Sequence, residues 1–129
     1  MSLETFTQAY IECALWAEMD NSDPNTGGDP LDRNYSADDI APETLTRIQA
    51  DCAKFYAANS ESWINAYPPA SEAWSDDERA GHDFWLTRNG HGAGFWDRGM
   101  GDIGDTLTDA CKVYREVDLY VGDDGLIYS

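Results

Sequence analysis

The sequence predicts an α+β fold with about four helices and a small antiparallel sheet that includes a C-terminal β-hairpin. Three observations predict it. Apolar residues recur at helical spacing in four segments, turn-forming residues separate these segments, and alternating apolar residues flank a Gly-Asp-Asp-Gly turn near the end. With 129 residues, 42% of them hydrophobic, the chain has material for a single domain over residues 1–129.

A wide apolar stripe predicts the first helix over residues 3–19. Because the stripe covers more than one side, this helix is expected to pack on several neighbours. The stripe consists of Phe6, Tyr10, Ile11, Cys13, Ala14, Leu15, Trp16 and Ala17. A turn-rich loop with two prolines and two glycines follows over residues 20–35.

The second helix is expected to open at Ser36 and Asp39, which can form a capping box, and Pro42 suits its first turn. Its pattern can run on through Trp63 to Tyr67, where two prolines end it. The residues expected on its buried face are Leu45, Ile48, Cys52, Phe55 and Tyr56.

A second capping box, Ser75 with Glu78, predicts a third helix over residues 76–88, and Asn89-Gly90 is its natural stop. A short strand is expected over residues 93–97, in a glycine-rich stretch. The third helix should bury Ala80, Phe84 and Trp85.

The fourth helix is expected over residues 102–115, because apolar residues recur along one side. That side holds Ile103, Leu107, Ala110, Cys111 and Tyr114. Residues 116–129 are typical of a hairpin. Its alternating apolar residues are Val117, Leu119 and Val121 before the turn, and Leu126 and Tyr128 after it.

The charge of the chain restricts its partners. Asp and Glu number 25 against eight Lys and Arg, which gives a formal net charge of −17. Such a surface repels phosphate backbones and anionic membranes, so neither direct nucleic-acid binding nor membrane binding is expected. The expected partner is a protein with a basic surface.

The three cysteines are expected to be free, since Cys13, Cys52 and Cys111 each fall on the apolar side of a predicted helix. Their usage favours a reducing compartment, and no leader or membrane-spanning run is visible. A cytoplasmic protein is the resulting expectation. No CxxC pair is present, so a thiolate zinc site is not expected.

Polar and aromatic residues are densest over residues 81–99, a composition typical of a small-ligand site. The candidate ligand-binding residues are His82, Asp83, Arg88, Asn89, His91, Asp97 and Arg98. The same groups can instead satisfy buried backbone around an irregular loop. No nucleophile–base motif, phosphate loop or cofactor motif accompanies them, so no catalytic residue is assigned and a non-enzymatic role is favoured.

Metal sites receive little support. His82 and His91 do not have the one-face spacing of a zinc-binding helix. Asp23, Asn25 and Gly28 fit some offsets of a calcium loop, but the twelfth position is an Asn where a bidentate Glu is needed. Turn formation explains these loop residues equally well.

The predicted fourth helix carries an acidic side opposite its apolar side. Its acids rise by roughly 4.5 to 10 Å along the axis, a scale comparable to DNA phosphates, so the row could act as a nucleic-acid mimic. A solvated helix face would look the same, and Lys112 interrupts the row. The row consists of Asp102, Asp105, Asp109 and Glu116.

Four stretches resemble a group of small acidic proteins encoded by tailed phages, prophages and some bacteria. They are AYIECALW in the first predicted helix, YSADDIAPETL at 35–45, AGHDFWLTRNGHGAGFWDRG at 80–99, and DLYVGDDG at 118–125. The resemblance implies no catalytic residues. It implies a protein made in a host cytoplasm and accessory to phage growth.

Charge, size and resemblance together predict a non-enzymatic phage-type accessory protein. It would act in host takeover by binding a host or phage protein through its acidic surface, as a nucleic-acid mimic where that partner binds DNA or RNA. Two alternatives stay open. One is a small-ligand-binding or catalytic domain centred on residues 81–99, and the other is a phage structural or assembly protein.

Overall fold

A computed structural model describes residues 2–20, 29–68, 74–90 and 92–129, and within these it confirms the α+β class. The described helices are α1 (Leu3–Ala17), α2 (Pro42–Trp63), α3 (Asp76–Arg88) and α4 (Asp102–Cys111). Two antiparallel hairpins pair β1 (Met19–Asp20) with β2 (Asp29–Pro30), and β3 (Tyr120–Val121) with β4 (Ile127–Tyr128). Three 3₁₀ turns complete the fold: η1 (Leu31–Arg33), η2 (Ala37–Asp39) and η3 (Phe95–Asp97).

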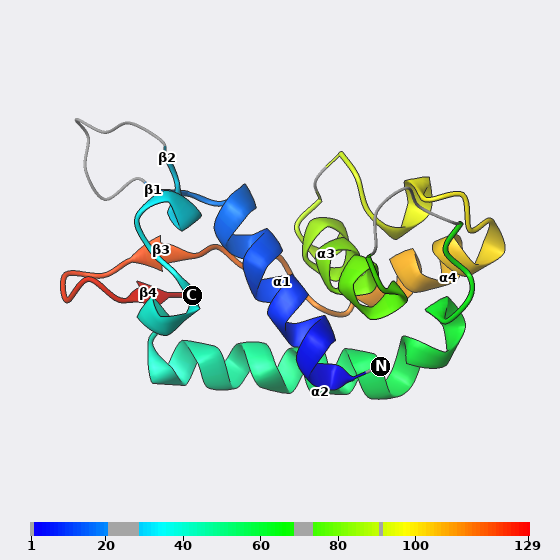
Figure 1. Ribbon diagram of the computed structural model, residues 1–129, viewed down its shortest axis with the longest axis horizontal. Coiled ribbons are helices and arrows are strands. Elements are labelled where there is room, and N and C mark those ends of the chain that lie inside the picture. The colour runs from blue at the N-terminus through cyan, green and yellow to red at the C-terminus, as the bar shows by residue number, and fades with distance from the viewer. Residues whose placement is uncertain (1, 21–28, 69–73, 91) are drawn as a thin grey trace.

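The long helix α2 runs along one side of the molecule, and α1 crosses it (Figure 1). At one end α3 and α4 pack on these two helices, and the two hairpins lie at the other end. The centre is aromatic: the rings of Phe55 and Phe84 stack with centroids 4.1 Å apart, and those of Phe6 and Trp63 lie 5.2 Å apart. All four side chains are fully buried, so this cluster joins α1, α2 and α3.

Helices α1 and α3 pack closely together, and Gly81 permits this. A Cβ atom at this position would lie 2.9 Å from the Cβ of Ala9 and closer still to the carbonyl oxygen of Phe6. The missing side chain therefore lets the two helix backbones touch.

The start and end of α2 differ from the sequence prediction. The capping box of Ser36 and Asp39 exists, but it caps η2, and α2 begins three residues after the end of that turn, with Pro42 at its first position. The helix ends at Trp63 and does not reach Tyr67, because Asn65 adopts a left-handed conformation with φ of 63°. Trp63 and Tyr67 are both buried nonetheless.

The expectation of a strand over residues 93–97 is wrong, because the last three of these residues form η3 and the first two lie outside any strand. The carboxylate of Asp97 accepts a hydrogen bond from the Gly94 N–H at 3.0 Å, and Phe95 N–H donates to Thr87 Oγ1 at 3.1 Å. The first bond curls the backbone locally, and the second ties the turn to α3.

Helix α4 ends at Cys111, not at residue 115. Two short-range bonds, from Lys112 N–H to the Asp109 carbonyl and from Tyr114 N–H to the Cys111 carbonyl, tighten the chain into turns. Of its predicted apolar side, Leu107 and Cys111 are buried, whereas Ile103 is 39% exposed.

The C-terminal hairpin forms as expected but turns a different residue inward. Ile127 is fully buried with Leu119, whereas the prediction placed Leu126 and Tyr128 on the apolar side. Ile127 also forms a parallel bridge with Ile40, and its carbonyl accepts from Ala41 N–H at 2.9 Å. The hairpin is thereby fixed to the chain just before α2.

The predicted burial of the three thiols is confirmed. Cys13, Cys52 and Cys111 are free and buried, and burial raises the pKa of each to about 12. Thiols of this kind are packing groups and weak nucleophiles. Among the described helices, none combines the length and apolar character that crossing a bilayer requires.

Candidate functional site

The candidate residues between 81 and 99 form structural networks, the first of them centred on Asp83. This carboxylate is buried and accepts hydrogen bonds from Tyr67 OH at 2.6 Å and Arg98 Nε at 2.9 Å. It also forms an ion pair with Arg98 Nη2 at 2.8 Å. Burial raises the pKa of Asp83 above its ordinary value, and the bonds from Arg98 and Tyr67 work in the opposite direction. The network ties α3 to the segments that flank it.

Arg88 is the centre of the second network. Its Nη1 donates to Tyr10 OH at 3.1 Å and to Asp51 Oδ2 at 3.0 Å, and its Nε and Nη2 donate to the Arg115 carbonyl at 3.0 and 2.8 Å. The neighbouring Asn89 accepts from Val117 N–H at 2.7 Å. Both side chains thus hold the segment after α4 against the end of α3.

The other candidates have separate surroundings. The His82 ring meets Trp74 edge-on with centroids 4.8 Å apart, and burial lowers the pKa of His82 below its ordinary value of 6.5. Asp97 caps η3, and His91 lies outside the described residues. Arg88 also lines a surface hollow of about 390 Å³, together with Lys112 and residues around them. The segment therefore uses these polar groups mainly to satisfy one another and the backbone.

In the described parts of the chain, no three or more His, Cys, Asp or Glu side chains are placed to hold a metal ion together. Three of the loop residues considered for calcium, Asp23, Asn25 and Gly28, lie outside those parts.

A buried carboxylate that the sequence did not single out is Asp77. Its Oδ1 accepts from Trp63 Nε1 at 2.9 Å, and its Oδ2 accepts from Tyr56 OH at 3.1 Å and Ser2 N–H at 2.9 Å. By its position Asp77 is a first-turn acid of α3, which by itself predicts an exposed side chain near the helix N-terminus. Trp63 and Tyr56 on α2 were the signal that could have identified this site. An indole N–H and a phenol O–H each need a polar partner when they are buried.

The acidic row expected on the fourth helix is partly assembled. Asp102, Asp105 and Asp109 are exposed on α4, but Glu116 lies beyond the end of this helix and is not part of its face. Lys112 Nζ pairs with Asp109 Oδ1 at 2.8 Å, which neutralises one member. The prediction that all four acids share one helix face is therefore wrong.

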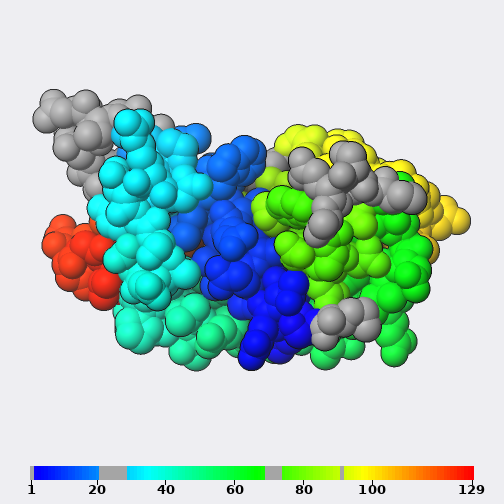
Figure 2. Space-filling model, viewed as in Figure 1, coloured from blue at the N-terminus to red at the C-terminus, as the bar shows by residue number. Residues whose placement is uncertain are grey.

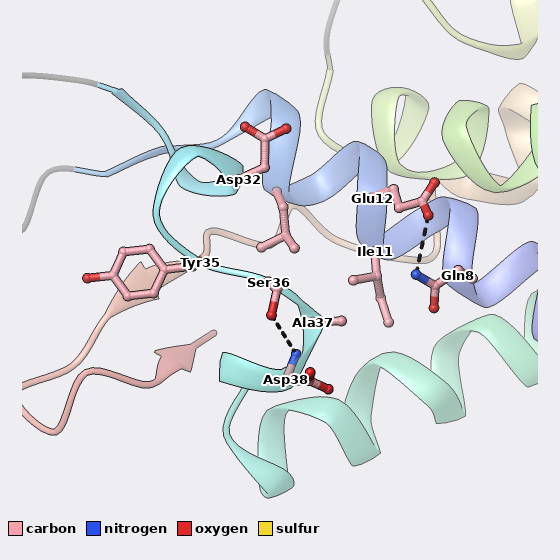
Figure 3. A pocket seen from close by; sticks show the side chains of 9 residues that line it. Gln8, Ile11, Glu12, Asp32, Tyr35, Ser36, Ala37 and Asp38 are labelled. Carbon is pink, nitrogen blue, oxygen red and sulfur yellow. Dashed lines mark hydrogen bonds between the residues drawn. The ribbon is translucent and has the colours of Figure 1, made fainter.

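A different acidic surface lies along α1 (Figure 3). A hollow of about 450 Å³ separates α1 from the segment containing η1 and η2, and Ile11 and Ala37 are among the apolar residues that line it. A second hollow of about 620 Å³ shares residues with the first and continues between α1 and α2. We call the two together the α1 groove. Its base and walls also include Leu3, Thr7, Gln8, Leu15, Tyr35, Ser36, Leu45, Gln49 and Ala53.

Every charged residue that lines the α1 groove is an acid. Glu4 and Glu12 stand on α1, and Asp32 and Asp38 stand on the opposite wall; all four are exposed. On α1 the acids share one row at i, i+4 spacing with Gln8 and with Trp16, which is 61% exposed. In the space-filling view α1 lies between the segment after β2 and helix α3 (Figure 2).

The arrangement is suited to binding cationic groups beside an apolar contact. Like charges that line a hollow with low-dielectric walls reinforce one another, so the potential inside is more negative than over a flat surface. The fold and this groove define an acidic α+β domain that carries an apolar groove flanked by acids. No model of a known protein family matches the chain, and neither does any curated protein or solved structure.

Proposed function

We propose that this protein is a non-enzymatic binding protein that engages a positively charged surface of another protein through the α1 groove. The single observation that carries the proposal is the composition of the groove. Its charged residues are all acidic, and they flank an apolar base. Burial of apolar surface gives affinity, and the acids give speed of encounter and discrimination against acidic partners.

The distribution of the basic residues supports the same function. Of the eight Lys and Arg side chains, five form ion pairs with Asp carboxylates of the described residues. Among the described acids, in contrast, only Asp20, Asp77 and Asp83 are buried. The acids that remain exposed give the surface a negative potential that attracts a basic partner from a distance.

The resemblance to small acidic phage-type proteins supports an accessory role in the cytoplasm of a bacterial host. Where the partner's basic surface normally binds DNA or RNA, occupation by this protein is nucleic-acid mimicry and inhibits that partner. The α4 row suits mimicry less well than expected, because Lys112 pairs with Asp109 and Glu116 is absent from the helix face.

Two matched variants test this function. The groove variant carries Glu12→Gln, Asp32→Asn and Asp38→Asn, and the control carries Asp102→Asn, Asp105→Asn and Asp109→Asn, so both lose three negative charges. Each is immobilised beside the wild type, and a bacterial lysate is passed over all three at about 0.1 M and about 0.5 M salt.

The expected result is a basic protein that the wild type and the α4 control retain at low salt, that the groove variant loses, and that high salt elutes. If the α4 control lost the basic protein and the groove variant retained it, the binding surface would lie on α4 and not in the α1 groove. Retention that is insensitive to both salt and variants would contradict binding by acidic groups altogether.

A further inference from the structure

We infer that the occupant of the α1 groove is an amphipathic helix of a partner protein, with Lys and Arg flanking its apolar face. This inference rests on the proposed function and names the chemistry of the partner segment. Three features of the groove carry it: its length, the absence of a strand edge among its lining residues, and the position of its acids.

The length of the groove matches a helix of about three turns. Its lining residues on α1 run from Leu3 to Leu15, which at 1.5 Å per residue is about 18 Å. A helix of this length presents apolar side chains at i, i+3 or i+4, and i+7 to a single stripe. The groove offers apolar side chains for such a stripe, among them Leu3, Ile11, Ala37 and Leu45.

The groove offers side chains and no strand edge. All of its lining residues belong to α1, α2, η1, η2 or the turn between the two 3₁₀ turns. An extended peptide adds to a protein through backbone hydrogen bonds with an unpaired strand, and these lining residues provide none. A helix satisfies its own backbone, so it can lie on such a surface without loss of hydrogen bonds.

The acids lie on both sides of the apolar stripe. Glu4 and Glu12 extend from α1, and Asp32 and Asp38 from the facing wall, so a helix in the groove meets carboxylates along both of its flanks. The Gln8 amide donates to Glu12 Oε1 at 3.3 Å and leaves the other carboxylate oxygen for a cation. One turn further along the same row, exposed Trp16 presents a ring to the last Lys or Arg of the segment.

The same charges argue against other occupants of the groove. Phosphates of a nucleic acid or a lipid headgroup would face four carboxylates with no cation among the lining residues to offset them. An acidic helix would be repelled in the same way. The chemistry that fits is cationic and amphipathic.

Synthetic peptides of about 16 residues test the inference on the full chain. One peptide has Leu and Lys at helical spacing. A second has the same composition with Leu and Lys in strict alternation, which favours a strand. Affinity is measured by titration calorimetry, the conformation of the bound peptide by circular dichroism, and the site by amide chemical shifts.

The helical peptide is expected to bind at least about tenfold more tightly than the alternating one, to gain helix on binding, and to shift amide signals along α1 and η2. Glu12→Lys with Asp38→Lys should weaken it by about tenfold or more. The matched control, Asp102→Lys with Asp105→Lys, should change the affinity less than about twofold.

The remaining outcomes separate the two proposals. If both peptides bound equally, and if only Glu12→Lys with Asp38→Lys abolished this binding, the helical occupant would be overturned and the proposed function would stand. If the two double variants, at residues 12 and 38 and at residues 102 and 105, weakened peptide binding equally, the attraction would depend on net charge only, and both proposals would be overturned. Absence of binding by either peptide at low salt would also overturn both.

Discussion

Asp77 shows how much one buried carboxylate can organise in a chain of this size. Its two oxygens accept from an indole N–H and a phenol O–H of α2 and from the backbone at the start of α1, while the residue itself belongs to α3. Three helices therefore meet at one charge. A buried charge of this kind is costly unless its hydrogen bonds are complete, so each donor matters.

Replacement of Asp77 by Asn should lower the free energy of unfolding by about 2–4 kcal/mol. The Asn side chain has one oxygen that accepts and one NH2 group that donates, so it cannot accept all three hydrogen bonds that the carboxylate accepts. Chemical denaturation followed by tryptophan fluorescence measures the loss. Asp105→Asn is the control, since this exposed acid should cost no more than about 0.5 kcal/mol. Similar losses in both variants would contradict the role given to Asp77.

His82 makes the stability depend on pH in a defined direction. Burial lowers its pKa in the folded protein, so the unfolded chain binds the proton more readily. The contribution of His82 is thus fully present above the unfolded pKa of about 6.5 and is lost as the pH falls through that value toward the lower folded pKa. An NMR titration should place the pKa of the folded imidazole below about 6.5.

The comparison with His82→Gln isolates this effect from the other titrating groups. Between about pH 7.5 and pH 5, the wild type should lose more stability than the variant, since only the wild type carries the imidazole at residue 82. An imidazole pKa at or above the ordinary value would refute the explanation.

Residue-level roles were the least predictable part of the candidate site. The sequence identified Asp83, Arg88 and Asn89 as unusual polar groups among aromatics, but their partners lie on other elements: Asp83 bonds to Tyr67, and Arg88 bonds to Asp51 and to the Arg115 carbonyl. Periodicity describes one element at a time, so it cannot supply a contact between two of them. It could not distinguish a ligand site from a structural network for this reason.

Among the elements, the pair α1 and α3 depends on a glycine inside a helix. A glycine there costs about 1 kcal/mol in helix propensity relative to alanine, and close packing against Phe6 and Ala9 compensates for that cost. Gly81→Ala should therefore destabilise the protein, by about 1–3 kcal/mol, although alanine favours helices in general.

The control for Gly81→Ala is Gly92→Ala, because a Cβ atom at residue 92 would meet no atom of the described residues within 4 Å apart from its chain neighbours. Its midpoint of thermal unfolding should stay close to that of the wild type. If Gly81→Ala raised the midpoint instead, the close contact between the two helices would be disproved.

Elements with strong local signals were predicted closely, and those governed by tertiary contacts were not. The capping box at Ser75 and the stop at Asn89-Gly90 gave α3 its observed bounds. The α1 groove escaped prediction because its walls come from helix α1 and from a turn more than 15 residues away, which no local pattern connects. The inward position of Ile127 likewise follows from its bridge to Ile40.

At the scale of the whole molecule, charge opposes folding. A net charge of −17 on 129 residues creates repulsion that compaction increases. Raising NaCl from about 0.02 M to about 0.5 M should therefore raise the midpoint of thermal unfolding by about 5 °C. The gain should shrink near pH 4, where many carboxylates are protonated. A midpoint that fell with salt at neutral pH would mean that attractive ion pairs dominate.

The bridge between Ile40 and Ile127 also bears on how the chain is made. A ribosome that has finished α1, α2 and their turns has not yet synthesised the residue that pairs with Ile40. Ribosomes extend a chain by about 5–20 residues per second. The nascent chain therefore spends several seconds between the synthesis of Ile40 and that of Ile127, with this side of its core open to solvent. Closure of the native structure is therefore a late event of biosynthesis, completed only once β4 emerges.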